Sequence, residues 1–311
     1  MAFRIVRNDI TKVKADAIVN TANPEPTYAE GTDRAVYEAA GAEYLLAERE
    51  RIGKLNVGQA APTPAFALPA KYVIHTVGPE WIDGTHGEAE ALRTCYQSCL
   101  DVALELDCQS VSFPLIATGV CGFPRPEALK IAVTVISEFL KEHEMKIILV
   151  VYDSEAFVLS GDVFADVDAY VNERMAAGET PEILEKSGAE LPEEGRPPKG
   201  MAWQDAILWW IEKKGFTETE VYRRANVGAA TFENVKNRTT QDPKKMTVAA
   251  FVFALRLSPT EGLDLMKRSG FRISHINKFD LIISYFLEHE IYDIFTVNLT
   301  LFDHRQPLLG E

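Results

Sequence analysis

Two amides and a carboxylate are spaced along one stretch of the chain, NTANPEPTYAEGTD, which runs from Asn20 to Asp33. The stretch joins an apolar strand-like run to a helical pattern, a connection that usually takes about two to six residues. Amides such as Asn20 and Asn23 can hydrogen bond both the backbone and a ligand. A carboxylate at the start of a helix can position or partly deprotonate a water, and it can equally complement the helix N-terminus. The long connection is therefore a candidate catalytic loop.

A second motif, LIATGVCGFPRPEA, covers Leu115 to Ala128. Gly119 and Gly122 let the backbone approach a ligand closely. The amides of residues 119–123 can converge on an anion near the N-terminus of the helix expected to begin at Pro126. An ordinary structural turn fits the same residues.

Two more residues follow expected strands. Asp9, in RNDITK, can accept a hydrogen bond from an exocyclic amine or can cap a turn. Phe157 opens an expected helix after VVYD, and a base stacked on an exposed ring is stabilised by about 1–3 kcal/mol. A core aromatic is the alternative interpretation of Phe157.

Strands and helices that alternate along the first half must position these residues. Apolar runs predict strands at residues 5–6, 16–20, 59–63, 72–76, 110–116 and 146–153, and helical spacing predicts helices at residues 32–51, 88–106, 126–141 and 154–174. This order predicts an α/β sandwich with a mixed, largely parallel sheet. Ligands bind outside the carboxyl ends of strands in such sheets, and the motifs follow the strands.

Charge is unevenly distributed along the 311 residues, whose formal net charge is −14. Residues 1–202 hold 18 basic and 32 acidic residues (18 − 32 = −14), and residues 203–311 hold 14 of each, giving zero. An acidic field repels nucleic acid at long range. An anion bound by the first half must therefore be held by local backbone dipoles.

Cysteine usage and the N-terminus point to a reduced compartment. All four cysteines, Cys95, Cys99, Cys108 and Cys121, lie in the first half, without the spacing of a zinc site. We interpret them as buried or half-buried thiols. The segment MAFRIVRNDITKV lacks the apolar core of a signal peptide, and the sequence has no run of 18 apolar residues. The sequence predicts a cytoplasmic protein with no membrane partner, and nothing in it requires a metal or cofactor.

The pattern of expected secondary structure changes after a linker rich in proline, glycine and acidic residues at 176–200. Short helices are expected beyond it, at residues 203–213, 218–224, 229–237, 245–257, 260–268 and 278–289. The expected domains are therefore residues 1–175, a flexible linker at 176–200, and an all-α domain at 201–311.

Six segments occur in order along the first domain: NDITK, DAIVNTAN, GTDRAVYEAAG, AKYVIHTVGP, FPLIATGVCGFP, and VVYD followed by Phe157. On these segments residues 1–175 resemble a macrodomain, the ADP-ribose-binding module, and specifically its MacroD-type branch. The resemblance implies a three-layer α/β/α fold that binds ADP-ribose or an ADP-ribosylated protein. It also implies hydrolysis of mono-ADP-ribose from modified proteins or of O-acetyl-ADP-ribose.

The resemblance also assigns roles to residues. Asp9 matches the aspartate that recognises the adenine amino group, Phe157 the aromatic that packs on adenine, and Asn23 the amide that contacts the distal ribose. Asp33 matches the loop aspartate tied to catalysis, where attack at the anomeric carbon passes through an oxocarbenium-like state. Catalytic roles are thus expected for Asn23 and Asp33, and ligand contacts for Asp9, Ile10, Asn20, Gly31, Ala117, Thr118, Gly119, Val120, Cys121, Gly122, Phe123, Asp153 and Phe157. His75 also matches a family position, and a hydrogen-bonded core histidine is the other interpretation.

Two departures from the family pattern bear on activity. Tyr28, Ala29 and Glu30 stand where active relatives usually carry glycines, which predicts a stiffer and bulkier loop. Cys121 stands where an aromatic is common. The first hypothesis is therefore a hydrolase, and the second is a non-catalytic sensor of ADP-ribose or another NAD-derived nucleotide.

The second domain resembles a helix-turn-helix domain of the Cro/repressor kind, on the segment TETEVYRRANVGAATFENVKN. The resemblance implies a recognition helix at residues 228–237, with outward residues that include Thr231, Asn234 and Lys236. Phosphate contacts would then come from Arg223, Arg224, Arg238, Lys244 and Lys245. The zero net charge is far from a basic DNA-binding footprint, so a protein partner and DNA both remain candidates.

Overall fold

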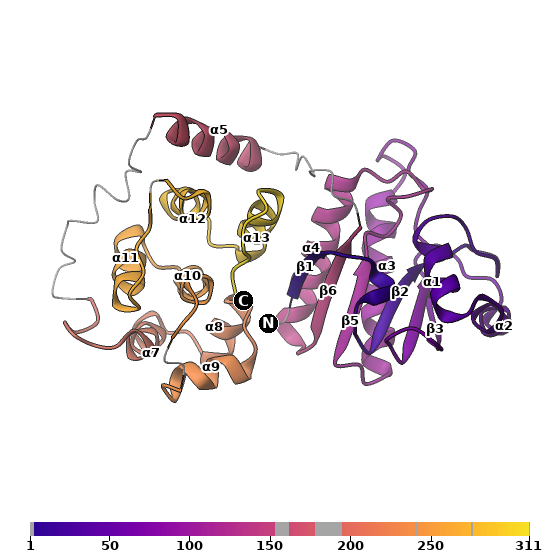
Figure 1. The fold of residues 1–311 in the computed structure, drawn as a ribbon, viewed down its shortest axis with the longest axis horizontal. Helices are drawn as coiled ribbons and strands as arrows, with labels where there is room; N and C mark the ends of the chain where they lie inside the picture. Colours follow the sequence, from indigo (N-terminus) through magenta and orange to yellow (C-terminus); the bar gives the residue numbers. More distant parts are fainter. Residues whose placement is uncertain (1–2, 153–161, 178–194, 240–241, 275, 311) are drawn as a thin grey trace. The chain divides into compact units, whose positions relative to one another are not determined.

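The computed structural model describes residues 3–152, 162–177, 195–239, 242–274 and 276–310 (Figure 1). The chain divides into two compact units, Ala2–Phe157 and Val158–Glu311, the second of which also includes Met1. Each unit is described by itself below. Within the described ranges, no helix is both long enough and apolar enough to cross a bilayer.

The first unit is built on one six-stranded sheet in the order β1-β6-β5-β2-β4-β3. Its strands are β1 (Phe3–Arg7), β2 (Ala17–Thr21), β3 (Ala60–Pro64), β4 (Tyr72–Thr76), β5 (Ser110–Pro114) and β6 (Lys146–Val151). Every pairing is parallel except that of β3 with β4. The expected mixed, largely parallel sheet is therefore confirmed. Its parallel strands all end at one edge, where the loops that carry the motifs begin.

Helices cover both faces of this sheet, giving three layers (Figure 1). The first face packs against α1 (Thr32–Ala40) and α2 (Ala42–Ile52), through a buried cluster that joins Val36 and Leu45 to Ile18 of β2 and Ile148 of β6. The second face packs against α3 (Glu88–Glu105), whose Tyr96 ring lies 5.5 Å from that of Phe113 in β5, with α4 (Arg125–Glu142) beside α3. A 3-10 turn, η1 (Ile10–Lys12), follows β1.

Strand alternation decides which side chains face the candidate loop. Successive side chains of a strand point to opposite faces, so Asn20 lies on the same face of β2 as Ile18. Asn20 is aligned with His75 of β4 across the parallel pair. Both polar side chains therefore face α1, inside an otherwise apolar layer. The single helix expected at residues 32–51 is broken at Gly41, whose φ of 98° ends α1 and begins α2.

The second unit is helical, as expected from its sequence. It contains α5 (Asp162–Ala177), α7 (Trp203–Lys214), α8 (Glu218–Arg224), α9 (Ala229–Lys236), α10 (Lys245–Ala254), α11 (Pro259–Arg268), α12 (Lys278–Glu288) and α13 (Ile294–Asp303). Residues Val248 to Ala254 of α10 are all buried, and α10 contacts α8, α11 and α13. A helix that is apolar on every side belongs at the centre of a bundle, so α10 forms the core of this unit.

Helix α5 belongs to this second unit, although the sequence analysis placed residues up to 175 in the first domain. The Tyr170 hydroxyl donates to Glu288 at the end of α12 at 2.9 Å, and the Tyr170 ring lies edge-on to Tyr285. His304, just after α13, lies 3.1 Å from Asp168. The expected boundary fails because periodicity defines a helix and its apolar face but does not show which core that face joins.

Candidate active site

Asp33 is buried at the start of α1, with 2% of its surface exposed. Its Oδ1 accepts a hydrogen bond from Asn20 Nδ2 at 2.7 Å, and its Oδ2 accepts one from the backbone amide of Ala29 at 2.8 Å. Gly31 turns the chain into the helix with a φ of 84°. The carboxylate therefore ties the end of the long loop to the strand that precedes it.

The environment of Asp33 opposes its ionisation. Burial raises the pKa of Asp33 above its ordinary value, while the bonds from Asn20 and Ala29 and the charge of Arg49 act in the opposite direction. Burial also raises the pKa of Tyr37 to about 12, with the charge of Asp33 adding to the effect. A carboxylate with a raised pKa in a buried site is typical of a group tuned for proton transfer or for orienting a substrate.

His75 continues this polar network into the sheet. Its Nδ1 lies 3.3 Å from Asn20 Nδ2, and its Nε2 lies 3.0 Å from the hydroxyl of Thr63. Because the amide nitrogen can only donate, these contacts fit a neutral ring that carries its proton on Nε2. Burial lowers the pKa of His75 to about 3. The interpretation of His75 as a hydrogen-bonded core histidine is confirmed.

The loop itself is held by several contacts of its own residues. Asn23 Nδ2 donates to the Thr27 hydroxyl at 3.1 Å, and the Tyr28 ring stacks on Tyr37 at 4.6 Å. Glu30 pairs with Arg34 on the surface, with 75% of the Glu30 side chain exposed. Glu30 is therefore a solvated surface residue. Asn23 is a half-buried residue of this loop, and a contact of its side chain with a ribose stays a prediction.

The second motif forms a tight turn at the end of β5. Ala117 takes a φ of 64° and Gly122 a φ of 68°, both in the left-handed region. The amide of Gly122 donates to Gly119 O and that of Phe123 to Ala117 O, each at 3.0 Å, while the Thr118 hydroxyl donates to Leu115 O at 2.9 Å.

These bonds reduce the number of backbone amides that are available to bind an anion. Of the amides at residues 119–123, those of Gly122 and Phe123 are used inside the turn. Within the described part of the chain, the amides of Gly119, Val120 and Cys121 donate to no other group. Val120 is 82% exposed at the tip of the turn. The anion-binding candidate is therefore the run of three amides at 119–121.

Cys121 is a poor nucleophile in this setting. Burial raises the pKa of its thiol, and the nearby charge of Glu80 adds to the effect. The thiolate is the reactive form of a cysteine, so a raised pKa lowers the reactivity of this one. Cys95, Cys99 and Cys108 are buried, as expected from the sequence.

Asp9 acts as a cap in this structure. Its Oδ1 accepts from the Thr11 amide at 3.0 Å and from the Thr11 hydroxyl at 2.7 Å. Burial opposes its ionisation, but these bonds and Lys12 hold the pKa of Asp9 below its ordinary value. Oδ2 lies 3.5 Å from Lys12 at the surface. Ile10 is buried in the core cluster, and Asp153 and Phe157 lie outside the described residues.

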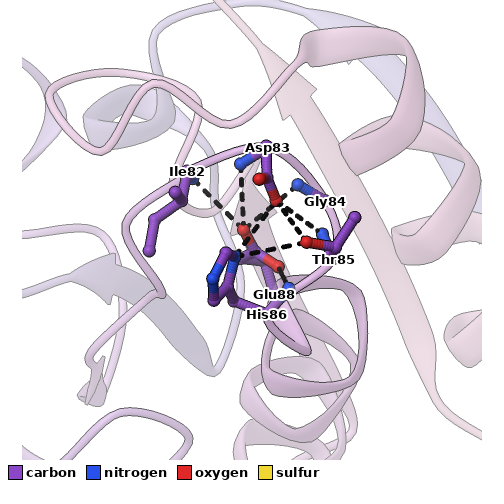
Figure 2. Close-up of polar contacts among 6 residues, drawn as sticks. All are labelled: Ile82, Asp83, Gly84, Thr85, His86 and Glu88. Atoms are coloured by element: carbon purple, nitrogen blue, oxygen red, sulfur yellow. Dashed lines mark hydrogen bonds and ion pairs between the residues drawn. The ribbon is translucent and has the colours of Figure 1, made fainter.

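A polar cluster formed by Asp83, His86 and Glu88 lies at the start of α3 and was not predicted from the sequence (Figure 2). Glu88 Oε1 accepts from the amides of Ile82, Asp83 and Gly84 at 3.1–3.2 Å, and its Oε2 accepts from the amide of His86 at 2.7 Å. Four amide dipoles thus point at the carboxylate. A metal ion there would face the same positive dipoles, so the cluster serves to close a loop.

This closed loop supports the anion-binding candidate. The Trp81 amide donates to Cys121 O at 2.8 Å, and the Trp81 ring packs edge-on against Phe123 with ring centroids 4.7 Å apart. The turn at residues 117–123 is therefore fastened to residues 81–88. Contacts of this kind between distant loops leave no local pattern in the sequence, so sequence reasoning missed them.

The fold and the loops at its carboxyl edge define a macro domain, and the Macro domain family matches this chain over residues 19–132. The chain belongs to this family. It is 46% identical over 158 residues to an O-acetyl-ADP-ribose deacetylase of Citrobacter rodentium, covering 49% of this chain and 89% of the relative. It is 44% identical over 137 residues to a macro domain-containing protein of Chlorobaculum tepidum, covering 44% of this chain and 79% of the relative.

A solved structure is also similar, an Oceanobacillus iheyensis macrodomain with ADP. It shares 38% identity with this chain, covers 49% of this chain and 83% of its own, and has a TM-score of 0.46. These relatives and the solved structure cover at most half of the chain.

Proposed function

We propose that the first unit binds ADP-ribose and hydrolyses either O-acetyl-ADP-ribose or mono-ADP-ribose attached to protein. The observation that carries this proposal is the buried Asn20–Asp33 pair beneath the long loop at the carboxyl edge of the sheet. The free amides at 119–121 follow β5, the neighbour of β2 in the sheet. Support also comes from relatives that are named O-acetyl-ADP-ribose deacetylases.

In this proposal the amides of residues 119–121 bind the diphosphate through backbone dipoles. This suits a unit whose acidic charge repels polyanions at long range. Asn23 contacts the distal ribose, and Asp33 orients a water or the ribose hydroxyls once the Ala29 amide releases Oδ2. For the ester substrate, the water oxygen attacks the acetyl carbonyl carbon. The ester C–O bond breaks, one proton of the water passes to the leaving ribose oxygen and the other is released, which gives acetate and ADP-ribose.

A sensor that binds the nucleotide without turnover is the second candidate. One observation favours it: both oxygens of Asp33 are engaged in hydrogen bonds and only 2% of the residue is exposed. The loop contacts of Tyr28 and Thr27 act in the same direction, because they oppose the movement that would release Oδ2. A search for turnover separates the two candidates.

The test is release of free ADP-ribose from a protein mono-ADP-ribosylated on acidic side chains, run beside release of acetate from O-acetyl-ADP-ribose. Asn23→Ala and Asp33→Ala serve as variants. Release by the wild type and its loss in Asp33→Ala are expected. Micromolar ADP-ribose binding without any release identifies a sensor, and absence of both binding and release overturns the proposal.

We further propose that the second unit carries a helix-turn-helix-like pair, α8 and α9, which directs the first unit to a protein partner rather than to DNA. Support comes from the basic residues expected to touch phosphates, because several of them are paired with acidic side chains. Arg238 pairs with Asp205, Lys245 pairs with the buried Asp280, and Arg224 lies 3.8 Å from Glu220.

The expected recognition helix is similarly neutralised. Lys236 of α9 pairs with Glu218 of α8 at 2.8 Å, and the Thr239 hydroxyl donates to Asn234 Oδ1 at 3.1 Å. DNA binding rests on cations available to phosphates. Retention of the full chain on a mixed-sequence duplex is therefore expected to be negligible at moderate salt, and salt-sensitive retention would favour DNA. A cytoplasmic location stays a prediction.

A further inference from the structure

A guanidinium is buried beneath the long loop of the first unit. Arg49 lies in the last turn of α2 and is 0% exposed. Its Nη2 donates to the backbone oxygens of Asn23 and Pro24, both at 3.1 Å, and its Nη1 donates to Gly53 O. One side chain therefore joins the start of the loop to the end of α2.

This contact reaches the backbone from which Asn23 extends. Pro24 O also accepts from the Leu55 amide at 2.9 Å, so the loop is attached at the same point to the segment that follows α2. The Asn23 side chain then points along the loop to Thr27, while its own carbonyl is held by Arg49. Movement of Arg49 would therefore displace Asn23 directly.

Arg49 is also the nearby charge that acts on Asp33. The titratable groups around Asp33 are His75 from β4, Tyr37 from α1 with Tyr28 stacked on it, and Arg49 from α2. The pKa of His75 is about 3 and that of Tyr37 is about 12, so both are neutral at physiological pH. The charge of Arg49 lowers the pKa of Asp33 against the effect of burial.

A buried charge is costly unless hydrogen bonds compensate it, and here the compensation comes from carbonyls. Arg49 forms no ion pair with any described residue. Three carbonyls accept from Nη1 and Nη2, while the buried Nε–H has no acceptor among the described residues, and the carbonyls leave the positive charge uncancelled. The guanidinium thus keeps its positive charge behind the loop, in a unit whose overall charge is negative.

We propose that Arg49 is a positioning residue of the candidate active site, which fixes the backbone of Asn23 and Pro24 and places a positive charge behind Asp33. The inference rests on the proposed hydrolysis. It predicts two separable effects, one of geometry, through the carbonyl contacts, and one of charge, through Asp33. Turnover should depend on both.

The test compares Arg49→Met, which removes charge and donors, with Arg49→Lys, which keeps the charge but cannot reach three carbonyls in the same fork. Arg51→Met is the matched control. Arg51 lies two positions along the same helix, 74% of its side chain is exposed, and it pairs with Glu48 at the surface. The readouts are the ADP-ribose Kd, kcat and KM for ADP-ribose or acetate release, and the pH dependence of kcat, with thermal unfolding as a check of the fold.

Arg49→Met is expected to lower kcat by about 10- to 100-fold through misplacement of Asn23 and Asp33. It should also move the acidic limb of the pH profile to higher pH, because Asp33 loses the cation that favours its ionised form. Arg49→Lys should lower kcat while leaving that limb near its wild-type position. Arg51→Met should match the wild type in every measurement.

Two results overturn the inference, and they are distinguishable from each other. If the wild type turns over and Arg49→Met matches Arg51→Met in kcat and in the pH limb, Arg49 has no positioning role. If the wild type releases neither product, the proposed hydrolysis fails and the role of Arg49 fails with it. If Arg49→Met does not fold, Arg49→Lys decides, and an unchanged kcat per folded molecule in that variant overturns the inference.

Discussion

Asn20 and Asp33 stand 13 residues apart and are joined by a buried hydrogen bond of 2.7 Å between Nδ2 and Oδ1. The bond closes the long loop, because Asn20 lies near the end of β2 and Asp33 lies in the first turn of α1. It also connects the carboxylate to His75, since the same amide nitrogen lies 3.3 Å from His75 Nδ1. The loop that carries the candidate chemistry is therefore anchored in the core of the first unit.

Asp33→Ala is expected to abolish turnover and to lower the free energy of unfolding by about 1–3 kcal/mol, because the buried amide of Asn20 and the partly buried amide of Ala29 lose their carboxylate acceptor. Asp33→Asn is expected to be nearly as harmful, since its amide group offers only one acceptor oxygen to those donors. ADP-ribose affinity should change by only a few fold. Product release, calorimetric binding and urea unfolding check the three effects.

Glu30→Ala is the matched control for Asp33, because Glu30 is an exposed carboxylate in the same loop whose partner is Arg34 on the surface. It should leave both turnover and stability near the wild-type values. A variant of Asp33 that keeps full turnover would show that the carboxylate has no part in the reaction.

The buried His75 predicts a loss of stability in acid. The folded state keeps the pKa of His75 at about 3, while the unfolded chain takes up the proton near the ordinary value of 6.5. Above pH 6.5 His75 therefore has no effect of this kind. As pH falls from 6.5 toward 3, proton uptake by the unfolded chain lowers the free energy of unfolding by up to about 1.4 kcal/mol per pH unit. Urea unfolding at a series of pH values measures the slope.

His75→Gln isolates this effect, because glutamine keeps polar atoms in the site but does not titrate. The variant is expected to be less stable than the wild type at neutral pH and to lose less stability between pH 6.5 and pH 4.5. Equal slopes for the two proteins would place the acid sensitivity elsewhere.

Glu88→Ala is expected to weaken ADP-ribose binding through the loop at residues 81–88 (Figure 2). Four amides lose their acceptor, and the loop then no longer holds Cys121 and Phe123 through Trp81. The exposed Glu90, in the same turn of α3, supplies the control variant Glu90→Ala. Calorimetry with ADP-ribose, together with thermal unfolding, measures the effect.

Acid should produce a related effect in the wild type. Backbone amides, its own first, hold the pKa of Glu88 at about 2, below the ordinary value of 4.5. The stabilisation is therefore present above pH 4.5 and is lost as pH falls from 4.5 toward 2. Added zinc or a chelator should leave the melting temperature unchanged, and a rise with zinc would revive a metal site at Asp83, His86 and Glu88.

The C-terminal segment of the second unit offers a stability test independent of any ligand. Asn298 is buried and bonds Leu309 twice, accepting from its amide at 2.7 Å and donating to its carbonyl at 3.1 Å. Gly310 follows with a φ of 88°, and a Cβ there would lie 2.6 Å from Asn226 O. Gly310→Ala should therefore destabilise this unit by about 1–3 kcal/mol.

Gly270→Ala is the matched control, since Gly270 has a φ of 83° but no atom within 4 Å of the added Cβ. It should lower the free energy of unfolding by about 1 kcal/mol, which is the cost of a side chain at positive φ without any steric clash. Tryptophan fluorescence reports on this unit, which holds Trp203, Trp209 and Trp210, whereas Trp81 lies in the other. Equal effects of the two substitutions would mean that the C-terminal segment is not packed as described.

Much of the fold could be predicted from local patterns. The strands at 72–76 and 146–151 appear as apolar runs, and the helix at 88–105 appears as a face of period 3.6. The break at Gly41 could not be predicted, because a glycine is tolerated inside many helices. The unit to which α5 belongs could not be predicted either, because an apolar face does not show which core it packs against. The loops that carry Asn23, Asp33 and Gly119 were found from their residue types and from the resemblance to a family.

The sequence by itself determined the alternation of strands and helices, the polar loops at one edge of the sheet, and the acidic charge of the first half. Tertiary structure alone decided that Asp33 is buried, that Glu88 closes the loop whose Trp81 bonds Cys121, and that Arg49 bonds the carbonyls of Asn23 and Pro24. The physical reason is that propensity and periodicity act between near neighbours in the chain. Burial, hydrogen bonding across loops and the resulting shifts in pKa depend on groups that only folding brings together.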